Sequence, residues 1–143
     1  MNLASIISDH GSDRPALIFE GTTITYGELR RLVAGMRERL AADGVGIDGR
    51  VMVACGNNPD FVVAALATLG VGGVAVPLNA ESPIPELEQR MDLVQPAAVV
   101  FNGATEHVRA TGAARGAMVV DTRDVPAADD DPTSIVSLSL IHI

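Results

Sequence analysis

Apolar residues along the chain follow two spacings, which together predict alternating strands and helices. Two β-prone runs, Ala16–Glu20 and Thr22–Thr25, flank a glycine that tolerates a positive φ, so we expect a β-hairpin near the N-terminus. Four short apolar runs are typical of strands in a buried parallel sheet: residues 51–54, 74–77, 97–101 and 118–121. Helical stretches separate them at the spacing of βαβ crossovers. The pattern predicts an α/β fold with a mainly parallel sheet and helices on its faces.

The first predicted helix begins at a capping box formed by Thr25 and Glu28. Its apolar positions recur at helical spacing and predict one buried stripe: Leu29, Leu32, Val33, Met36 and Leu40. Charged residues of this helix, Arg37 among them, are expected to lie mostly outside the stripe. Gly44 and Gly46 should end the helix, because glycine readily takes the backbone conformation that follows a last helical turn.

Start signals also predict the later helices. Asn58 can cap a second helix with Pro59 at its first position. The buried face predicted for this helix has five members: Phe61, Val62, Ala65, Leu66 and Leu69. Pro85 starts a third helix, and residues 106–110 allow a short fourth one. Residues 124–133 are rich in Pro, Ala and Asp, so we expect a solvated linker there.

Composition narrows the functional classes. The chain has 143 residues, 48% of them hydrophobic, which is enough for one packed domain or one lobe of a larger one. The net charge is −8 and all ten basic residues are arginines, so we expect no nucleic-acid partner. Since the sequence contains no lysine, it cannot supply a phosphate-loop lysine or a Schiff-base lysine.

Cysteine usage and hydropathy indicate the compartment. The single cysteine, Cys55, cannot form an intrachain disulfide, which is typical of proteins in a reducing cytosol. Residues 1–5 show neither a basic segment nor the start of a long apolar core, so they do not read as a signal peptide. The longest apolar run, Phe61–Leu69, is too short to cross a bilayer. We expect a cytoplasmic protein without a transmembrane segment.

Two glycine-containing segments invite a ligand interpretation. Gly70–Ala75 matches the dinucleotide fingerprint G-x-G-x-x-A, but that motif must follow a strand and open a helix. Here a helix precedes it and a strand follows, so a tight turn is the better interpretation. Gly56-Asn57-Asn58 does lie between a strand and a helix, where backbone amides can meet an anion. With one glycine in it, an ordinary N-cap turn is favoured.

The remaining candidates are single polar residues or short clusters. Cys55 lies at a strand end, where a nucleophile can be exposed, but no motif places a histidine beside it, and a small buried side chain is the default. Asp129–Asp131 is a metal candidate only if other ligands converge on it, so a solvated run is favoured. His10 and His107 have no metal-ligand spacing to each other, and His142 belongs to a C-terminal segment that we expect to be non-native. We therefore assign no catalytic, cofactor-binding or metal-binding residue.

Five segments, taken in order, resemble the AMP-forming acyl-CoA synthetases of the adenylate-forming family, from about residue 14 to residue 136. Residues 15–29 resemble the opening "P-A-L … G … T-Y-x-E-L" signature. Residues 44–51 resemble "G-V-x-x-G-D-x-V", with Asp and Gly exchanged at 48 and 49. Residues 58–61 resemble "N-x-x-E-F". Residues 69–79 resemble "L-K-A-G-A-x-x-V-P-L-N", with Gly70 where lysine is common.

The fifth segment lies near the C-terminus. Residues 130–136 resemble "D-D-x-A-x-I-x", which precedes the family's Gly-rich phosphate loop "T-S-G-T-T-G-x-P-K-G". In this chain, residues 137–143 contain neither Gly nor Lys, whereas backbone amides of a Gly-rich loop are needed to surround phosphate oxygens. Residues 138–143 are also what CTGTCTCTTATACACATC encodes, which resembles the end of a transposon adapter used in sequencing libraries. We expect residues 137–143 to be a non-native tail.

The resemblance implies a fold and a reaction for the parent protein. Residues 1–136 would be the incomplete N-terminal part of an AMP-binding adenylation domain, with the remainder of its own chain as a missing partner. The full enzyme would join a small-molecule carboxylic acid to CoA, using ATP and Mg²⁺, in fatty acid metabolism. The catalytic motifs lie beyond Val136, so we expect this chain to bind no cofactor and to be inactive alone. Two alternatives remain: a stand-alone α/β binding module, and a fragment of a peptide-synthetase adenylation domain.

Overall fold

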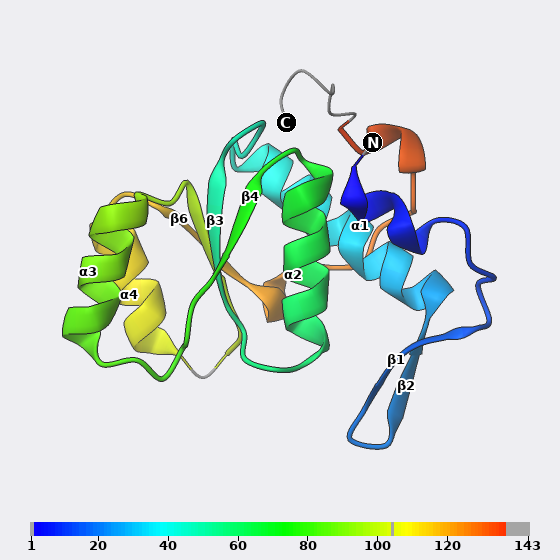
Figure 1. Ribbon diagram of the computed structural model, residues 1–143, viewed down its shortest axis with the longest axis horizontal. Helices are drawn as coiled ribbons and strands as arrows, with labels where there is room; N and C mark the ends of the chain where they lie inside the picture. Colours follow the sequence, from blue (N-terminus) through cyan, green and yellow to red (C-terminus); the bar gives the residue numbers. More distant parts are fainter. Residues whose placement is uncertain (1, 104, 137–143) are drawn as a thin grey trace.

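A four-stranded parallel sheet forms the centre of the computed structural model, which describes residues 2–103 and 105–136. The strands run in the order β4-β3-β5-β6, and each neighbouring pair is parallel (Figure 1). Their bounds are β3 (Arg50–Ala54), β4 (Val74–Pro77), β5 (Ala98–Phe101) and β6 (Met118–Asp121). All four apolar runs identified in the sequence are strands, which confirms the predicted parallel sheet. The expected non-native tail, residues 137–143, lies outside the described residues.

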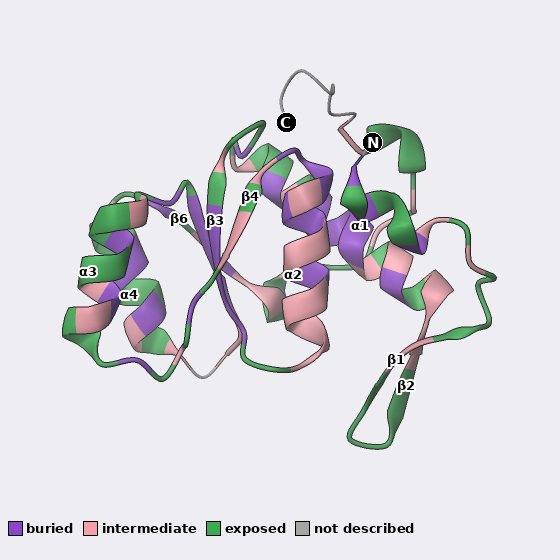
Figure 2. Cartoon of the chain, in the orientation of Figure 1, coloured by how far each residue is buried: buried purple, intermediate pink, exposed green. Residues whose placement is uncertain are grey.

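Helices cover both faces of the sheet. Their bounds are α1 (Tyr26–Ala42), α2 (Pro59–Gly70), α3 (Ile84–Val94) and α4 (Glu106–Ala114). Successive strand residues point to opposite faces: Val51 and Val53 pack with α1 and α2, whereas Met52 and Ala54 pack with α3 and α4. Strand β3 is buried along most of its length (Figure 2). Since both faces are buried, the central strands read as continuous apolar runs. This confirms the βα alternation.

A two-stranded hairpin, β1 (Pro15–Phe19) and β2 (Thr22–Thr25), projects away from the sheet beside α1 (Figure 1). Phe19 pairs with Thr22, which leaves a two-residue turn, Glu20-Gly21, with φ values of 49° and 78°. Positive φ at both turn positions suits the twist of an antiparallel hairpin. The hairpin was predicted, and its Ile18 is exposed.

The capping box joins this hairpin directly to α1. The Glu28 amide donates to Thr25 Oγ1 at 3.2 Å, and the Thr25 amide donates to Glu28 Oε2 at 3.4 Å. Four members of the predicted stripe are fully buried: Leu29, Val33, Met36 and Leu40. Arg37 lies outside the core cluster formed by the stripe, as predicted, yet it is only 6% exposed. A segment almost a hundred residues later in the chain covers it, and no helical periodicity can indicate such a partner.

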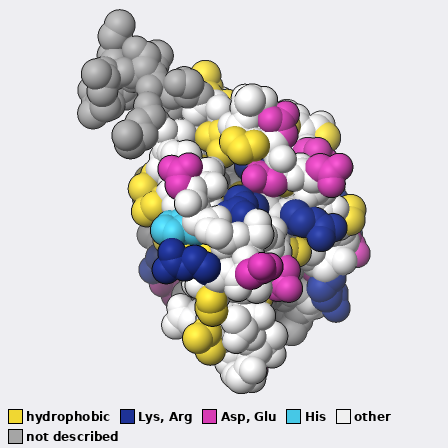
Figure 3. Space-filling model, turned by 90° about the vertical axis from the view of Figure 1, so that its right-hand side faces the viewer, with side chains coloured by type: hydrophobic (Ala, Val, Ile, Leu, Met, Phe, Trp, Pro, Cys, Tyr) yellow, Lys and Arg dark blue, Asp and Glu magenta, His cyan; other side chains and the backbone are white. Residues whose placement is uncertain are grey.

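The segment predicted as a solvated linker lies along α1. The Ala128 amide donates to the Arg31 carbonyl at 3.0 Å, and Asp130 lies 3.8 Å from Arg30 Nε. Most side chains between 124 and 133 are exposed, which agrees with the predicted solvated linker, and the contacts with α1 are a further feature of this segment. On the face formed by the N-terminal segment and the hairpin, arginine and acidic side chains are interspersed (Figure 3).

Helix α2 begins as predicted but buries a different face. The Asp60 amide donates to Asn58 Oδ1 at 3.0 Å, so Asn58 is the N-cap. The most buried apolar side chains are those of Val63, Ala64 and Ala67, whereas the five predicted ones are only partly buried. Because α2 is apolar on all sides, spacing alone cannot single out the face that meets the sheet.

Among the described residues, no helix combines the length and hydropathy needed to span a bilayer.

Candidate functional site

The order of the strands marks one crevice in the sheet as a candidate binding site. After β3 the chain passes through α2 to β4 at one edge, and after β4 it passes through α3 to β5 on the other side of β3. Since α2 and α3 cover opposite faces, the carboxyl ends of β3 and β5 flank the point where the winding reverses. In open α/β sheets, ligands bind outside the carboxyl ends of strands at such a point.

A cleft of about 700 Å³ lies at this position. Ligand pockets in proteins are typically about 300–1,000 Å³. Residues that directly follow β3, β4 and β5 line the cleft, together with the first turn of α2. Its polar lining is mostly neutral and comprises Asn57, Asn79, Asn102 and Thr105, with Glu81 as the charged member. We refer to this space as the strand-end cleft.

Hydrogen bonds between secondary-structure elements hold the residues beside the strand-end cleft in place. Asn102 Nδ2 donates to the Cys55 carbonyl at 3.0 Å and to Asp60 Oδ2 at 3.4 Å. Thr122 Oγ1 donates to the same Asp60 oxygen at 3.2 Å. These bonds connect the ends of β3, β5 and β6 to the start of α2. Because the groups satisfy one another, their role is architectural. Nearby, hydrogen bonds from Arg123 lower the pKa of Asp121 to about 2.

Cys55 lines this cleft but is not an activated nucleophile. Its side chain is 2% exposed, and its Sγ lies 3.8 Å from the Val100 carbonyl oxygen. Burial, with smaller contributions from the carboxylates of Asp60 and Asp121, raises the pKa of the Cys55 thiol to about 12. A reactive cysteine needs the opposite shift. The thiol is therefore neutral near pH 7, which agrees with the sequence interpretation of Cys55 as a small buried side chain.

We expect iodoacetamide to alkylate Cys55 at pH 8 roughly a hundredfold more slowly in the native chain than in urea. The unfolded thiol has a pKa of about 8.5 and ionises, whereas the folded thiol stays protonated. The same difference should lower the free energy of unfolding as pH rises from about 8.5 to the folded pKa of about 12, because the unfolded state releases its proton first. Mass spectrometry of the alkylated chain measures the rates. Equal rates in both states would contradict the buried placement of Cys55.

The two glycine segments have the structures expected of turns. Gly56 has a φ of 73° and precedes the N-cap Asn58, so this segment is a strand-to-helix turn. Gly70–Ala75 runs from the end of α2 into β4, with Gly72 at a φ of 81°. Helix precedes strand, as the sequence indicated, and the order required for a dinucleotide fingerprint is absent from this segment.

The acidic run and the histidines considered as metal ligands make hydrogen bonds or ring contacts within the chain. Asp131 Oδ1 accepts from the Thr133 amide at 3.0 Å, and hydrogen bonds from Thr133 lower the pKa of Asp131. His10 stacks on Tyr26 with ring centroids 4.3 Å apart, and His107 Nε2 lies 2.8 Å from the Ala80 carbonyl oxygen. In residues 2–103 and 105–136, no group of three or more His, Cys, Asp and Glu can hold a metal ion. His142 lies outside the described residues.

The sequence considered Gly56 and Asn57 of the strand-end cleft, in the turn after β3, but did not identify Asn79 and Asn102. Asn102 directly follows β5, and Asn79 comes two residues after β4. The carboxyl ends of parallel strands lie at one edge of a sheet, so polar residues just after predicted strands were an available signal. Arg37 was also missed, although a buried arginine has no comparable sequence signal.

Comparison with known proteins gives matches over most of the chain. The family model described as "AMP-binding enzyme" matches residues 6–139. A feruloyl-CoA synthase from an Amycolatopsis species is 35% identical over 117 residues, which cover 80% of this chain and 23% of the synthase. The hybrid PKS-NRPS synthetase LUC5 from a Fusarium species is 32% identical over 89 residues, which cover 62% of this chain and 2% of the synthetase.

Solved structures show the same fold. The ATP-bound MatB from Rhodopseudomonas palustris superposes with a TM-score of 0.71 at 25% identity, covering 92% of this chain and 30% of MatB. A benzoate CoA ligase from Burkholderia xenovorans LB400 superposes with a TM-score of 0.80 at 18% identity, covering 97% of this chain and 31% of the ligase. The chain therefore spans less than a third of the length of the feruloyl-CoA synthase and of these two enzymes.

Proposed function

Because the chain belongs to the AMP-binding enzyme family of adenylate-forming ligases, we propose that it is the N-terminal part of a ligase that joins an aromatic carboxylic acid to CoA. The observation that carries this proposal is the alignment with a feruloyl-CoA synthase over 80% of the chain. Its name points to an aromatic acid rather than to the fatty acids suggested by the sequence resemblance. The similarity to the benzoate CoA ligase supports the fold alone.

The proposed reaction has two steps in the complete enzyme. A carboxylate oxygen attacks the α-phosphorus of ATP, pyrophosphate leaves, and an acyl-adenylate forms. The CoA thiolate then attacks the acyl carbon, a thioester forms, and AMP leaves. Such chemistry depends on cationic and backbone N–H groups that stabilise charge on the phosphate oxygens. The sequence contains no lysine, so the chain cannot supply a lysine as one of these cationic groups.

Two alternatives have observations of their own. The similarity to the PKS-NRPS synthetase LUC5 supports a peptide-synthetase adenylation domain, although it covers less of the chain. The strand-end cleft supports a small-molecule binding module that acts alone. The genomic reading frame after residue 136 separates this last alternative from a ligase. A frame that continues into a Gly-rich Thr-Ser-Gly-Thr-Thr-Gly segment supports the ligase, and a stop codon there supports the module.

We expect the 143-residue chain to show no ATP–pyrophosphate exchange with any carboxylic acid, and the polypeptide extended along the genomic frame to show exchange with ferulate or benzoate. The extension would supply the phosphate-binding loop that the sequence resemblance places after residue 136. Radiolabelled exchange, with heat-killed protein as the control, measures both. Exchange by the 143-residue chain would contradict its inactivity. Exchange by the extended polypeptide with amino acids alone would favour the peptide-synthetase alternative.

A further inference from the structure

Arg37 is the buried charged residue of the described chain. Burying a charge is costly unless hydrogen bonds and an opposite charge compensate it. The Arg37 side chain donates to Ser134 Oγ from Nε at 3.2 Å and from Nη2 at 2.9 Å, and Nη2 also donates to the Asp131 carbonyl at 3.2 Å. The carboxylate of Asp130 lies 3.9 Å from Nη2. The described partners of the guanidinium thus all belong to one short segment.

We call residues 130–136 the strap. Beyond Arg37, two further hydrogen bonds hold its end: the Val136 amide donates to the Gly70 carbonyl at 2.8 Å, and Asn2 Nδ2 donates to the Val136 carbonyl at 3.0 Å. Residues 131–134 of the strap are exposed. Because residues 131–134 bury little apolar surface, their docking depends mainly on polar contacts. Arg37 supplies three hydrogen bonds and an ion pair with Asp130, and Arg30 supplies a second ion pair with Asp130.

Gly70 provides the space through which Arg37 reaches the strap. A Cβ at position 70 would lie 2.8 Å from Arg37 Cδ, which is closer than real Cβ contacts. The aliphatic part of Arg37 therefore occupies the volume that a side chain at position 70 would take. Since Gly70 also accepts the hydrogen bond from the Val136 amide, the side chain of Arg37 and the backbone of Gly70 hold the strap at neighbouring points.

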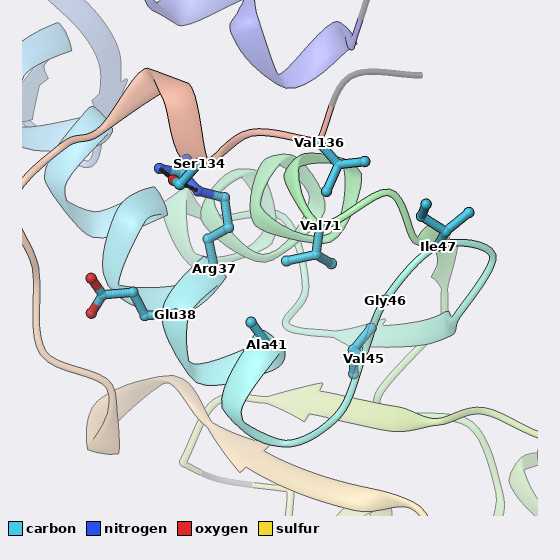
Figure 4. Close-up of a pocket in the computed structure, with 9 residues that line it drawn as sticks. All are labelled: Arg37, Glu38, Ala41, Val45, Gly46, Ile47, Val71, Ser134 and Val136. Atoms are coloured by element: carbon cyan, nitrogen blue, oxygen red, sulfur yellow. Dashed lines mark hydrogen bonds between the residues drawn. The ribbon is translucent and has the colours of Figure 1, made fainter. Parts of the chain in front are cut away.

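The strap forms one wall of an apolar groove of about 290 Å³ (Figure 4). Val45 and Ile47 come from the loop between α1 and β3, and Val71 directly follows α2. Ser134 and Val136 come from the strap. Figure 4 shows Arg37 reaching from α1 to Ser134, with Val71 between α1 and the strap. Release of the strap would remove this wall and leave both core clusters in place, because neither cluster contains a strap residue.

We propose that the contacts of Arg37 hold the strap closed against α1. The strap then opens and closes as a unit, independently of the sheet, and so removes or restores one wall of the groove. Local opening of this kind is characteristic of segments with few buried apolar contacts. The proposal rests on contacts within this chain and is independent of the reaction that the complete enzyme performs.

Hydrogen exchange of the full chain, followed by NMR, tests this proposal. The measured quantity is the protection of the Val136 amide, which donates to the Gly70 carbonyl. In Arg37→Met, the long apolar side chain keeps the packing over Gly70 and removes all the donors, so protection of the Val136 amide should fall about tenfold or more. Amides of β3 and β5 should keep their protection. Arg31→Met is the matched control, because Arg31 is on the same helix and exposed, and its protection pattern should equal that of the unsubstituted chain. Arg37→Lys should lie in between, since one ammonium group cannot reproduce the guanidinium fork.

A second variant keeps the test decisive if Arg37→Met does not fold. Ser134→Ala removes the exposed acceptor of two Arg37 hydrogen bonds, and with it the bond that Ser134 Oγ donates to the Asp131 carbonyl within the strap. It leaves α1 unchanged, so it should lower Val136 protection several-fold. Unchanged Val136 protection in Ser134→Ala and in folded Arg37→Met would overturn the proposal. Equal loss of protection in β3, β5 and Val136 would also overturn it, because the strap would then open only when the whole chain unfolds.

Discussion

Replacing Leu87 with alanine should destabilise the chain by about 2–5 kcal/mol, whereas the same substitution at Leu93 should change the stability by less than about 0.5 kcal/mol. Both residues lie on α3, so the two substitutions make the same change of side chain within one helix. Leu87 is fully buried against the sheet, in the cluster that contains Met52 and Val99, and Leu93 is 85% exposed. Only the Leu87 substitution leaves a cavity, whose walls lose contacts that no other atoms replace.

Urea unfolding of the two variants, followed by circular dichroism, measures this difference. A change in stability shifts the urea concentration at the midpoint and leaves the dependence of the free energy of unfolding on urea unchanged. A domain of this size is stable by about 5–15 kcal/mol, so the expected loss at Leu87 is a large share of the total. Equal effects at Leu87 and Leu93 would show that α3 does not pack on the sheet with the face that contains Leu87. A change in slope for Leu87→Ala would instead indicate that the unfolding is no longer two-state.

The sheet was predictable from sequence because its strands are buried on both faces. A strand with both faces buried has no polar side, so a continuous apolar run is enough to predict it. This holds for Val51–Ala54 and Ala98–Phe101. Helix starts were predictable because their signals are local: Thr25 and Asn58 make their capping bonds within three residues. The short fourth helix was underestimated, and α4 extends to Ala114.

Features that depend on distant partners were not predictable. Arg37 is buried because residues 130–134 return to α1, and the face that α2 buries is decided by its neighbours rather than by its own spacing. The strand-end cleft combines residues after β3, β4 and β5, which come together only once the strand order is known. The sequence was more informative about the family than about any site, because its motifs are turns and caps that specify the fold.

At Gly35 in α1, helix propensity favours alanine, whereas contact with the backbone of residues 126–127 requires glycine. In an isolated helix, changing an interior glycine to alanine stabilises by about 1 kcal/mol. In this chain, a Cβ on Gly35 would overlap the carbonyl oxygen of Pro126 and lie 3.2 Å from Ala127 Cα. Both are backbone atoms, so the clash cannot be relieved by rotating a side chain. The segment that lies along α1 has to move instead.

We expect Gly35→Ala to be net destabilising by about 1–3 kcal/mol, because overpacking against backbone outweighs the gain in helix propensity. Hydrogen exchange should show faster exchange of the Ala128 amide, which donates to the Arg31 carbonyl one turn from Gly35. Gly46→Ala is the matched control, since a Cβ there would meet no atom within 4 Å, and its stability should stay within about 0.5 kcal/mol of the unsubstituted chain. If Gly35→Ala proved more stable than the unsubstituted chain, with Ala128 still protected, residues 126–127 would not lie against α1. The contact that separates this segment from an ordinary solvated linker would then be absent.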